Sequence, residues 1–250
     1  MSTAEEALAR CESLCGDPGA VRPEDVEWLI EAFDHPMKVV QRAAGTALVA
    51  IARAGTDVSR SLEDAMASDS SRRRWVAAWT AGQIPGVDAR SIAPALFEAL
   101  GVDDGDVRWA AARMLTGRAE RDEVAKGLLA LGASGNAAQR KMALYCLRDL
   151  GRRDAAAAVR YREGLRDDDA GVRLAAMSAL ARVGSVRADD ARRIAALLDD
   201  PEGGVRRAAA ATLGRGGVSD EVVRDALARA AQDDDPVLAR IARGAIGRLR

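Results

Sequence analysis

Aromatic residues are scarce in this sequence: four Trp, two Tyr and two Phe stand among 250 residues. The apolar residues, 48% of the chain, are mostly Ala, Leu and Val. This composition suits closely packed helices better than a sheet, whose core is rich in aromatic and β-branched residues. We therefore expect an all-α protein with enough apolar residues to bury a sizeable core.

Cysteine and histidine are also rare. Cys11, Cys15 and Cys146 are too few and too scattered for a disulfide framework, and they lack the paired spacing of zinc ligands. His35, the one histidine, directly precedes a proline, where a turn residue is expected rather than a general base. We predict no metal site, no cofactor and no catalytic constellation, and therefore a protein that is not an enzyme.

Long hydrophobic runs are missing as well. No apolar stretch approaches the ~20 residues that cross a bilayer, and the first residues lack the basic start and apolar run of a signal peptide. These absences favour a cytoplasmic protein without membrane contact. The net charge of -1 provides no overall basic field for non-specific binding of nucleic acid, although a local basic patch is compatible with it.

A motif of about 33 residues repeats along the chain in seven copies. Each copy has an amphipathic segment, an acidic loop and a second segment in which an anchor residue is usually followed by Arg and then by small apolar residues. This order predicts a helix, a turn and a second helix. The anchors, two residues before Trp75 and at the matching places, are Val40, Arg73, Val107, Gln139, Val172, Val205 and Leu238.

The repeat resembles HEAT repeats, and more closely the short HEAT-like variety named after phycobilisome lyases. Residues 200–214, Asp-Pro-Glu-Gly-Gly-Val-Arg-Arg-Ala-Ala-Ala-Ala-Thr-Leu-Gly, carry the resemblance most clearly. It implies a right-handed α-α superhelix, an armadillo-type solenoid of about seven helix pairs. It does not imply lyase activity, because such repeats serve many unrelated functions.

We expect a single domain over residues 1–250, because no flexible linker interrupts the series. Residues 1–22 form an N-terminal cap, with a helix over 3–15. The predicted repeats span about 23–55, 56–87, 88–119, 120–152, 153–185, 186–217 and 218–250.

Helix ends and helix faces follow from the same alignment. An aspartate comes directly before a proline at Asp200 and Asp235, and two places before a proline at Asp34. These three acids are predicted to cap the second helices. Glycines in a left-handed conformation should end these helices, at Gly55, Gly86, Gly151, Gly184 and Gly216. In the fifth copy, the helical period places small and aliphatic residues in the core: Val172, Ala175, Ala176, Ala179, Leu180 and Val183. Cys146 and Trp28 are also expected in the core.

The residue after the anchor is usually arginine. Its expected role is to tie the second helix to an acidic turn of its own or the neighbouring copy, since Arg pairs well with carboxylates. These arginines are Arg74, Arg108, Arg140, Arg173 and Arg206.

Two rows of residues, two and six places after each anchor, should point away from the core and line the surface of the second helices, expected to be the concave one. The first row is Arg42, Trp75, Trp109, Lys141, Leu174, Arg207 and Arg240; the second is Thr46, Trp79, Arg113, Tyr145, Ser178, Ala211 and Gly244. Neither row contains an acid. Exposed tryptophans usually mark an interaction site, so we predict a binding surface that includes Arg42, Trp75, Trp79, Trp109, Arg113, Lys141, Tyr145 and Arg207.

The preferred function is a non-enzymatic scaffold that binds an acidic or aromatic-containing segment of another protein. In a purely structural alternative, the tryptophans instead cover neighbouring helices and seal the grooves between copies. Binding of single-stranded nucleic acid by stacking is a further alternative. The tryptophans also look similar to those of HEAT-like alkylpurine DNA glycosylases, but such enzymes need a carboxylate in the cluster, and the two rows offer none.

Overall fold

The computed structural model describes residues 3–117, 121–184, 186–218 and 220–249. These residues form fifteen α-helices and two short 3-10 helices, and no strand occurs among them. The all-α prediction is therefore confirmed. None of the described helices combines the length and the apolar character that crossing a bilayer requires.

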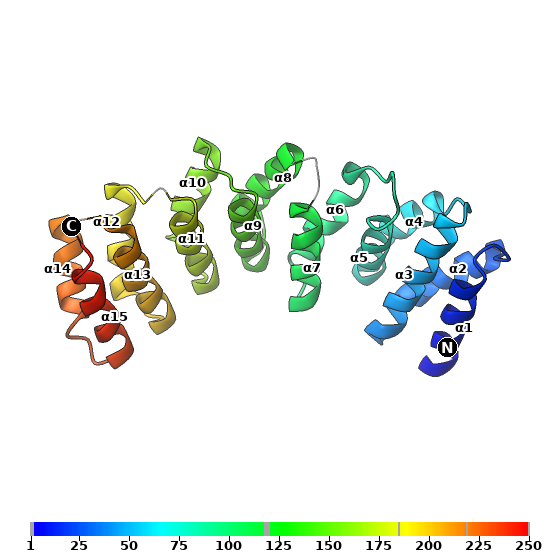
Figure 1. The fold of residues 1–250 in the computed structure, drawn as a ribbon, viewed down its shortest axis with the longest axis horizontal. Helices are drawn as coiled ribbons and strands as arrows, with labels where there is room; N and C mark the ends of the chain where they lie inside the picture. Colours follow the sequence, from blue (N-terminus) through cyan, green and yellow to red (C-terminus); the bar gives the residue numbers. More distant parts are fainter. Residues whose placement is uncertain (1–2, 118–120, 185, 219, 250) are drawn as a thin grey trace. The chain divides into compact units, whose positions relative to one another are not determined.

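The chain forms two compact units, residues 1–120 and residues 121–250 (Figure 1). The helices of the first unit are α1 (Ala4–Gly16), α2 (Pro23–Glu31), α3 (Lys38–Arg53), α4 (Ser59–Met66), α5 (Ser71–Ala81), α6 (Ala89–Ala99) and α7 (Gly105–Thr116), with the 3-10 helix η1 (Ala32–Asp34). Those of the second are α8 (Arg121–Ser134), α9 (Ala137–Asp149), α10 (Ala155–Gly164), α11 (Ala170–Arg182), α12 (Ala188–Ala196), α13 (Gly203–Gly216), α14 (Glu221–Ala230) and α15 (Pro236–Ile246), with η2 (Leu197–Asp199). Each predicted repeat contains one helix pair. A single continuous domain stays a prediction.

Each unit consists of two layers of helices. In the first unit, α1 packs on α3 and α3 on α5, so α1 takes the place of a second helix at the start of that layer. In the second unit, α9, α11, α13 and α15 pack on one another in turn, while α8, α10, α12 and α14 form the other layer. The layer of the first unit is less regular, because α7 packs on α6 but has only slight contact with α5.

The core contains mainly small and aliphatic residues. All six core residues predicted for the fifth copy are buried, and so is Cys146. Burial raises the pKa of the Cys146 thiol to about 12, so this thiol stays protonated at neutral pH. The prediction for Trp28 is only partly right, because its side chain is half-buried. The Arg10 guanidinium lies 4.2 Å from its ring centroid, in a cation–π contact.

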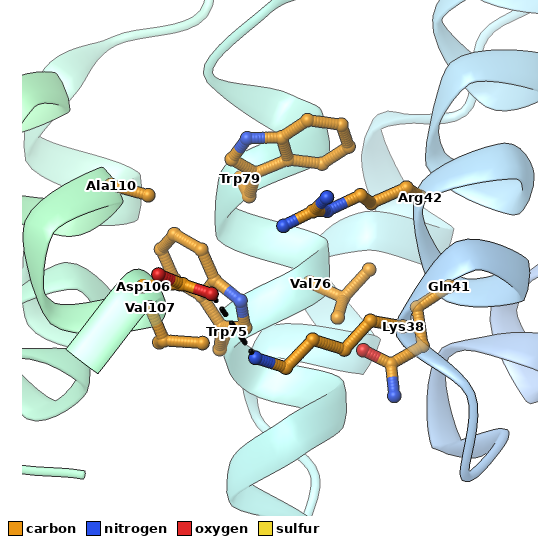
Figure 2. A pocket seen from close by; sticks show the side chains of 9 residues that line it. All are labelled: Lys38, Gln41, Arg42, Trp75, Val76, Trp79, Asp106, Val107 and Ala110. Atoms are coloured by element: carbon orange, nitrogen blue, oxygen red, sulfur yellow. Dashed lines mark ion pairs between the residues drawn. The ribbon is translucent and has the colours of Figure 1, made fainter. Parts of the chain in front are cut away.

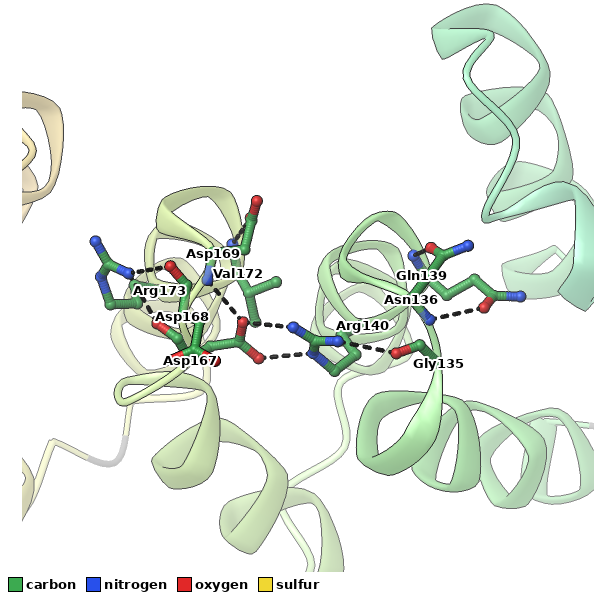
Figure 3. A network of polar contacts seen from close by, with 9 residues as sticks. All are labelled: Gly135, Asn136, Gln139, Arg140, Asp167, Asp168, Asp169, Val172 and Arg173. Carbon is green, nitrogen blue, oxygen red and sulfur yellow. Dashed lines mark hydrogen bonds and ion pairs between the residues drawn. The ribbon is translucent and has the colours of Figure 1, made fainter.

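The arginines after the anchors have the predicted role in most copies. Arg74, Arg140 and Arg173 form ion pairs with Glu98, Asp167 and Asp200, which lie 24, 27 and 27 residues further along the chain. All five arginines also donate to a backbone carbonyl five or six residues before them. Figure 3 shows this arrangement for Arg140, whose Nε and Nη2 both lie 2.7 Å from Asp167. Arg108 and Arg206 make only the carbonyl contact within the described residues.

Two of the three predicted helix caps are wrong. Asp235 does cap α15, since its carboxylate accepts from the backbone N–H of Val237 and Leu238. Asp34 instead lies in η1, where it accepts from Ser70 Oγ and Arg73 Nε of the next copy, and Asp200 forms its ion pair with Arg173. In both cases a guanidinium of the neighbouring copy binds the carboxylate. The helices then begin later, at Lys38 and Gly203.

Four of the five predicted left-handed glycines have a positive φ, from 70° to 105°: Gly55, Gly86, Gly151 and Gly184. The prediction for Gly216 is wrong by one residue. Gly216 is the last residue of α13, and Gly217 adopts the left-handed conformation with φ 63°.

Candidate binding surface

The eight predicted surface residues are divided between the two units. Arg42 lies on α3, Trp75 and Trp79 on α5, and Trp109 and Arg113 on α7, all in the first unit. Lys141 and Tyr145 lie on α9 and Arg207 on α13, in the second unit. A continuous patch that includes both groups stays a prediction.

Trp79 fills the groove between two neighbouring helices. It is half-buried, and its ring lies over Gly45 of α3: a Cβ at Gly45 would come within 2.9 Å of Trp79 Cζ3. The indole therefore occupies the space that a side chain on α3 would need. This packing, at the contact between the first and second copies, is what the structural alternative predicts for Trp79.

Trp75 lies beside a small hollow in the layer formed by the second helices of the first unit, α3, α5 and α7. Because α5 and α7 have only slight contact, this hollow remains between the three helices, with a volume of about 60 Å³. Trp75 and Trp79 line it together with Arg42, Lys38 and residues at the start of α7 (Figure 2). A second hollow of about 250 Å³ lies toward the helix N-termini, and Lys38, Gln41, Trp75 and Val107 line both. We call this pair of cavities the Trp75 hollow.

A lysine bridges the first and third copies across this hollow. Lys38 Nζ forms an ion pair with Asp104 and lies 3.7 Å from Asp106 Oδ2. Asp104 also caps α7, accepting from the backbone N–H of Asp106 at 3.0 Å and of Val107 at 3.3 Å. The hydrogen bond from Lys38 lowers the pKa of the Asp104 carboxyl and raises the pKa of Lys38. Both groups therefore stay charged at neutral pH.

These carboxylates correct the expectation of a surface without acids. Asp104 and Asp106 lie three and one places before Val107, outside the two rows, which contain only the places two and six after each anchor. Lys38 also lies outside the two rows, one helical turn before Arg42, so its position could be predicted by extending the first row by one turn.

Two of the predicted surface residues of the first unit are cations without a carboxylate partner within the residues that the structure describes. Arg42 and Arg113 are exposed and form no ion pair there. Figure 2 shows the Arg42 guanidinium pointing into the space beside the two indole rings. Trp109, on the neighbouring helix, is 47% exposed. The surface of the first unit thus combines one unpaired guanidinium at the hollow with an accessible tryptophan beside it.

The predicted residues of the second unit are less available. Arg207 Nε lies 2.9 Å from Asp235 Oδ2, so its charge is neutralised within the molecule. Tyr145 is half-buried, with the Arg148 guanidinium 4.8 Å from its ring centroid. Lys141 is also half-buried.

The described residues contain no group of three or more His, Cys, Asp or Glu that could hold a metal ion. His35 Nδ1 accepts from the backbone N–H of Met37 at 3.1 Å, which is the contact of a turn residue. Burial raises the pKa of the Cys11 thiol to about 11, so a reactive thiolate is not present there at neutral pH.

The arrangement of the helices matches that of known repeat proteins. The X-ray structure of the Escherichia coli protein YibA aligns with all of this chain and 97% of its own, at 16% identity and a TM-score of 0.54. The chain is a helical-repeat solenoid. Its helix pairs fit HEAT-like repeats in this coarse sense, without showing which subfamily they belong to.

Two designed armadillo repeat proteins are also similar. One is 14% identical over 76% of this chain and 99% of its own, with a TM-score of 0.49. The other, solved in complex with the peptide (KR)4, is 13% identical over 89% of this chain and 98% of its own, with a TM-score of 0.48. No protein-family model matches the chain, and no curated relative matches it.

Proposed function

We propose that the protein is a non-enzymatic scaffold and that the Trp75 hollow of the first unit holds a short segment of a partner protein. The observation that carries this proposal is the juxtaposition of the half-buried Trp75 with the unpaired Arg42 guanidinium at an open cavity. We also propose a cytoplasmic location and membership of the short, phycobilisome-lyase-type HEAT-like repeats.

The size of the hollow favours a partner side chain over a small-molecule ligand. Sites for small molecules commonly enclose about 300 to 1,000 Å³. Cavities of about 60 and 250 Å³, open to the surface, accommodate one or two side chains of a peptide. An aromatic or aliphatic side chain in contact with Trp75 would remove apolar area from water on both partners.

The charge of the partner is set locally. The first unit has 13 basic and 19 acidic residues, a net charge of -6, so long-range attraction does not favour a strongly acidic partner. Arg42 nevertheless offers a charge-assisted hydrogen bond at the edge of the hollow. The segment that fits best is therefore mainly apolar or aromatic, with a single carboxylate placed to reach Arg42.

Peptide selection followed by substitution tests this proposal. Peptides that pair an aromatic residue with Asp or Glu, selected for binding to the full chain, are titrated against Trp75→Ala and Arg42→Gln by fluorescence anisotropy. Each substitution is expected to weaken binding by about tenfold, or ~1.4 kcal/mol, by removing the apolar contact or the charged donor. Trp75→Phe keeps most of the apolar contact and should bind nearly as well as wild type.

The control for Arg42→Gln is Arg53→Gln, which removes the same charge from an exposed residue at the end of α3. It should leave affinity unchanged. Unchanged binding by both Trp75→Ala and Arg42→Gln, with a helical circular dichroism spectrum, would place the partner elsewhere and refute the proposal.

One observation bears on the glycosylase alternative, which needs a carboxylate near the tryptophans. Asp106 lines the hollow beside Trp75 and supplies the carboxylate that the two rows lack. However, its side chain is 82% exposed and lies near Lys38, and a carboxylate screened by water and a cation stabilises developing positive charge poorly. Incubation with duplex DNA that contains alkylated purines should release no base, and product formation that Asp106→Asn abolishes would replace the scaffold proposal with an enzyme.

A further inference from the structure

A second hollow, in the second unit, is surrounded by three arginines. It lies along α13 and α15, the last two second helices. Its lining residues are Ala211, Gly214, Arg215, Arg240, Ile241, Gly244 and Arg248. It is wider and shallower than the Trp75 hollow, with a volume of about 830 Å³. None of its lining residues is an acid. We call it the arginine hollow.

The three guanidinium groups keep donors for a ligand. None of them forms an ion pair within the described residues. Arg215 has one long hydrogen bond, from Nη2 to Thr212 Oγ1 at 3.4 Å, and Arg248 donates Nε to the Gly214 carbonyl at 3.2 Å. All three side chains belong to exposed residues. This contrasts with the arginines that follow the anchors, whose donors are used by carboxylates and carbonyls of the fold itself.

Two glycines line the arginine hollow, and only one of them is required by packing. We call this part of the lining its floor. A Cβ at Gly214 would come within 2.8 Å of Arg248 Nη2 and 2.9 Å of Ala245 Cβ, so α13 and α15 need a glycine there. A Cβ at Gly244 would meet only Arg248 Nη2, at 3.9 Å. Glycine inside a helix costs about 1 kcal/mol relative to alanine. At Gly244 this cost has no packing reason among the described residues, and its effect is to keep the floor open.

We propose that the arginine hollow binds an extended acidic segment of another polypeptide. Arginine pairs with carboxylates in a bidentate geometry, and three guanidinium groups without acidic neighbours select a segment with several of them. The open floor at Gly244 lets the backbone of that segment approach α15 closely. The second unit carries 24 basic and 19 acidic residues, so its net charge of +5 also steers an acidic partner toward it.

Single-stranded nucleic acid fits this hollow less well. Proteins that bind it combine a basic groove with aromatic side chains on which bases stack. The residues that line the arginine hollow include no aromatic, and Ile241 is its largest apolar residue. The chemistry available is therefore recognition of carboxylates along a backbone, without a platform for bases.

Titration with a defined probe tests the proposal on the full chain. The probe is a fluorescein-labelled peptide of alternating Glu and Ala, with a Gln-for-Glu peptide and an oligothymidine of similar length as comparisons. The Glu peptide should bind, the Gln peptide should not, and binding should weaken as salt screens the charges. Arg240→Gln, which removes one of the three cations, is expected to weaken the Glu peptide about tenfold. Gly244→Glu should do the same by filling the floor and supplying a competing carboxylate.

Arg193→Gln serves as the matched control, because it removes the same charge from an exposed residue of α12, in the other layer of the unit. If Arg240→Gln and Arg193→Gln bound the Glu peptide with equal affinity, only the net charge of the unit would matter for binding, and the proposal would be overturned. Failure of the Glu peptide to bind, or tighter binding of oligothymidine that is lost in Arg240→Gln, would overturn it as well. Neither substitution lies in the first unit, so these results are independent of the Trp75 hollow.

Discussion

Gly45 shows how the absence of one side chain positions a tryptophan. A Cβ at this residue would come within 2.6 Å of Thr80 Oγ1 and 2.9 Å of Trp79 Cζ3, both on the next helix of the layer. Trp79 can cover α3 only because nothing projects from it at this place. The sequence shows a glycine within a strongly helical segment, but the partner that fills the space lies 34 residues away, at Trp79.

Gly45→Ala is therefore expected to destabilise the protein, although alanine is the better helix former. Overpacking of this kind typically costs about 1 to 3 kcal/mol, which exceeds the gain of about 1 kcal/mol from helix propensity. Gly244→Ala is the matched control: it enters open space within α15 and should stabilise the chain slightly. Urea denaturation followed by circular dichroism measures both midpoints. The explanation fails if the two substitutions shift the midpoint in the same direction.

The periodicity of the sequence predicts where side chains of one helix point, and the structure confirms this for the core residues of α11. It also places Arg42, Trp75 and Trp109 on the accessible side of their helices. It could not predict that Lys38 pairs with Asp104 and Asp106, because that ion pair joins the first and third copies. Aligned copies show which residues are at equivalent positions, but not which residues at non-equivalent positions of two copies contact each other.

At the scale of elements, carboxylates near helix starts have two uses. Asp235 caps α15 and also accepts from Arg207 of the preceding copy. Asp200, which looks equivalent in the sequence, accepts from Arg173 of the preceding copy but does not cap α13. The side chains of Arg173 and Asp200 are only 10% and 4% exposed, so this ion pair is largely shielded from water. The sequence predicts the helix pairs well, because apolar periodicity sets them, but the partner of each acid depends on the neighbouring copy.

Removal of these two acids should therefore have unequal effects. Asp235→Ala loses a helix cap, which typically costs about 1 kcal/mol, and a partly exposed ion pair with Arg207, which adds at most about 1 kcal/mol. Asp200→Ala leaves the Arg173 guanidinium buried without a carboxylate, and breaking a buried pair typically costs about 3 to 5 kcal/mol. Thermal unfolding by calorimetry compares the two. Adding Arg173→Met to Asp200→Ala should recover part of the loss, because no unpaired charge then remains; a double variant as unstable as Asp200→Ala alone would contradict this account.

At the scale of the whole molecule, the near-zero net charge conceals two units of opposite sign. The first has a net charge of -6 and the second of +5, and each offers a different hollow on its second-helix layer. The overall charge of -1 argues against non-specific binding to nucleic acid, but it says little about either surface. The two proposed sites differ accordingly, with an aromatic contact in the first unit and several arginines in the second.

The repeat organisation also determines how far a local change spreads. In a solenoid most contacts lie within a copy or between adjacent copies, so stability is close to a sum of terms within and between neighbours. The ion pair between Lys38 and Asp104 in the first unit is an exception. Loss of the Arg173–Asp200 ion pair should therefore loosen α11, η2 and α13, since α13 packs on both of the others, and have little effect on α1, α3 and α5. Hydrogen exchange followed by mass spectrometry on Asp200→Ala measures this directly. We expect faster exchange in peptides from residues 170–182 and 203–216 and wild-type exchange in residues 4–81. A uniform increase along the chain would instead mean that the molecule unfolds as one cooperative body, and that coupling between copies exceeds the stability of any single helix pair.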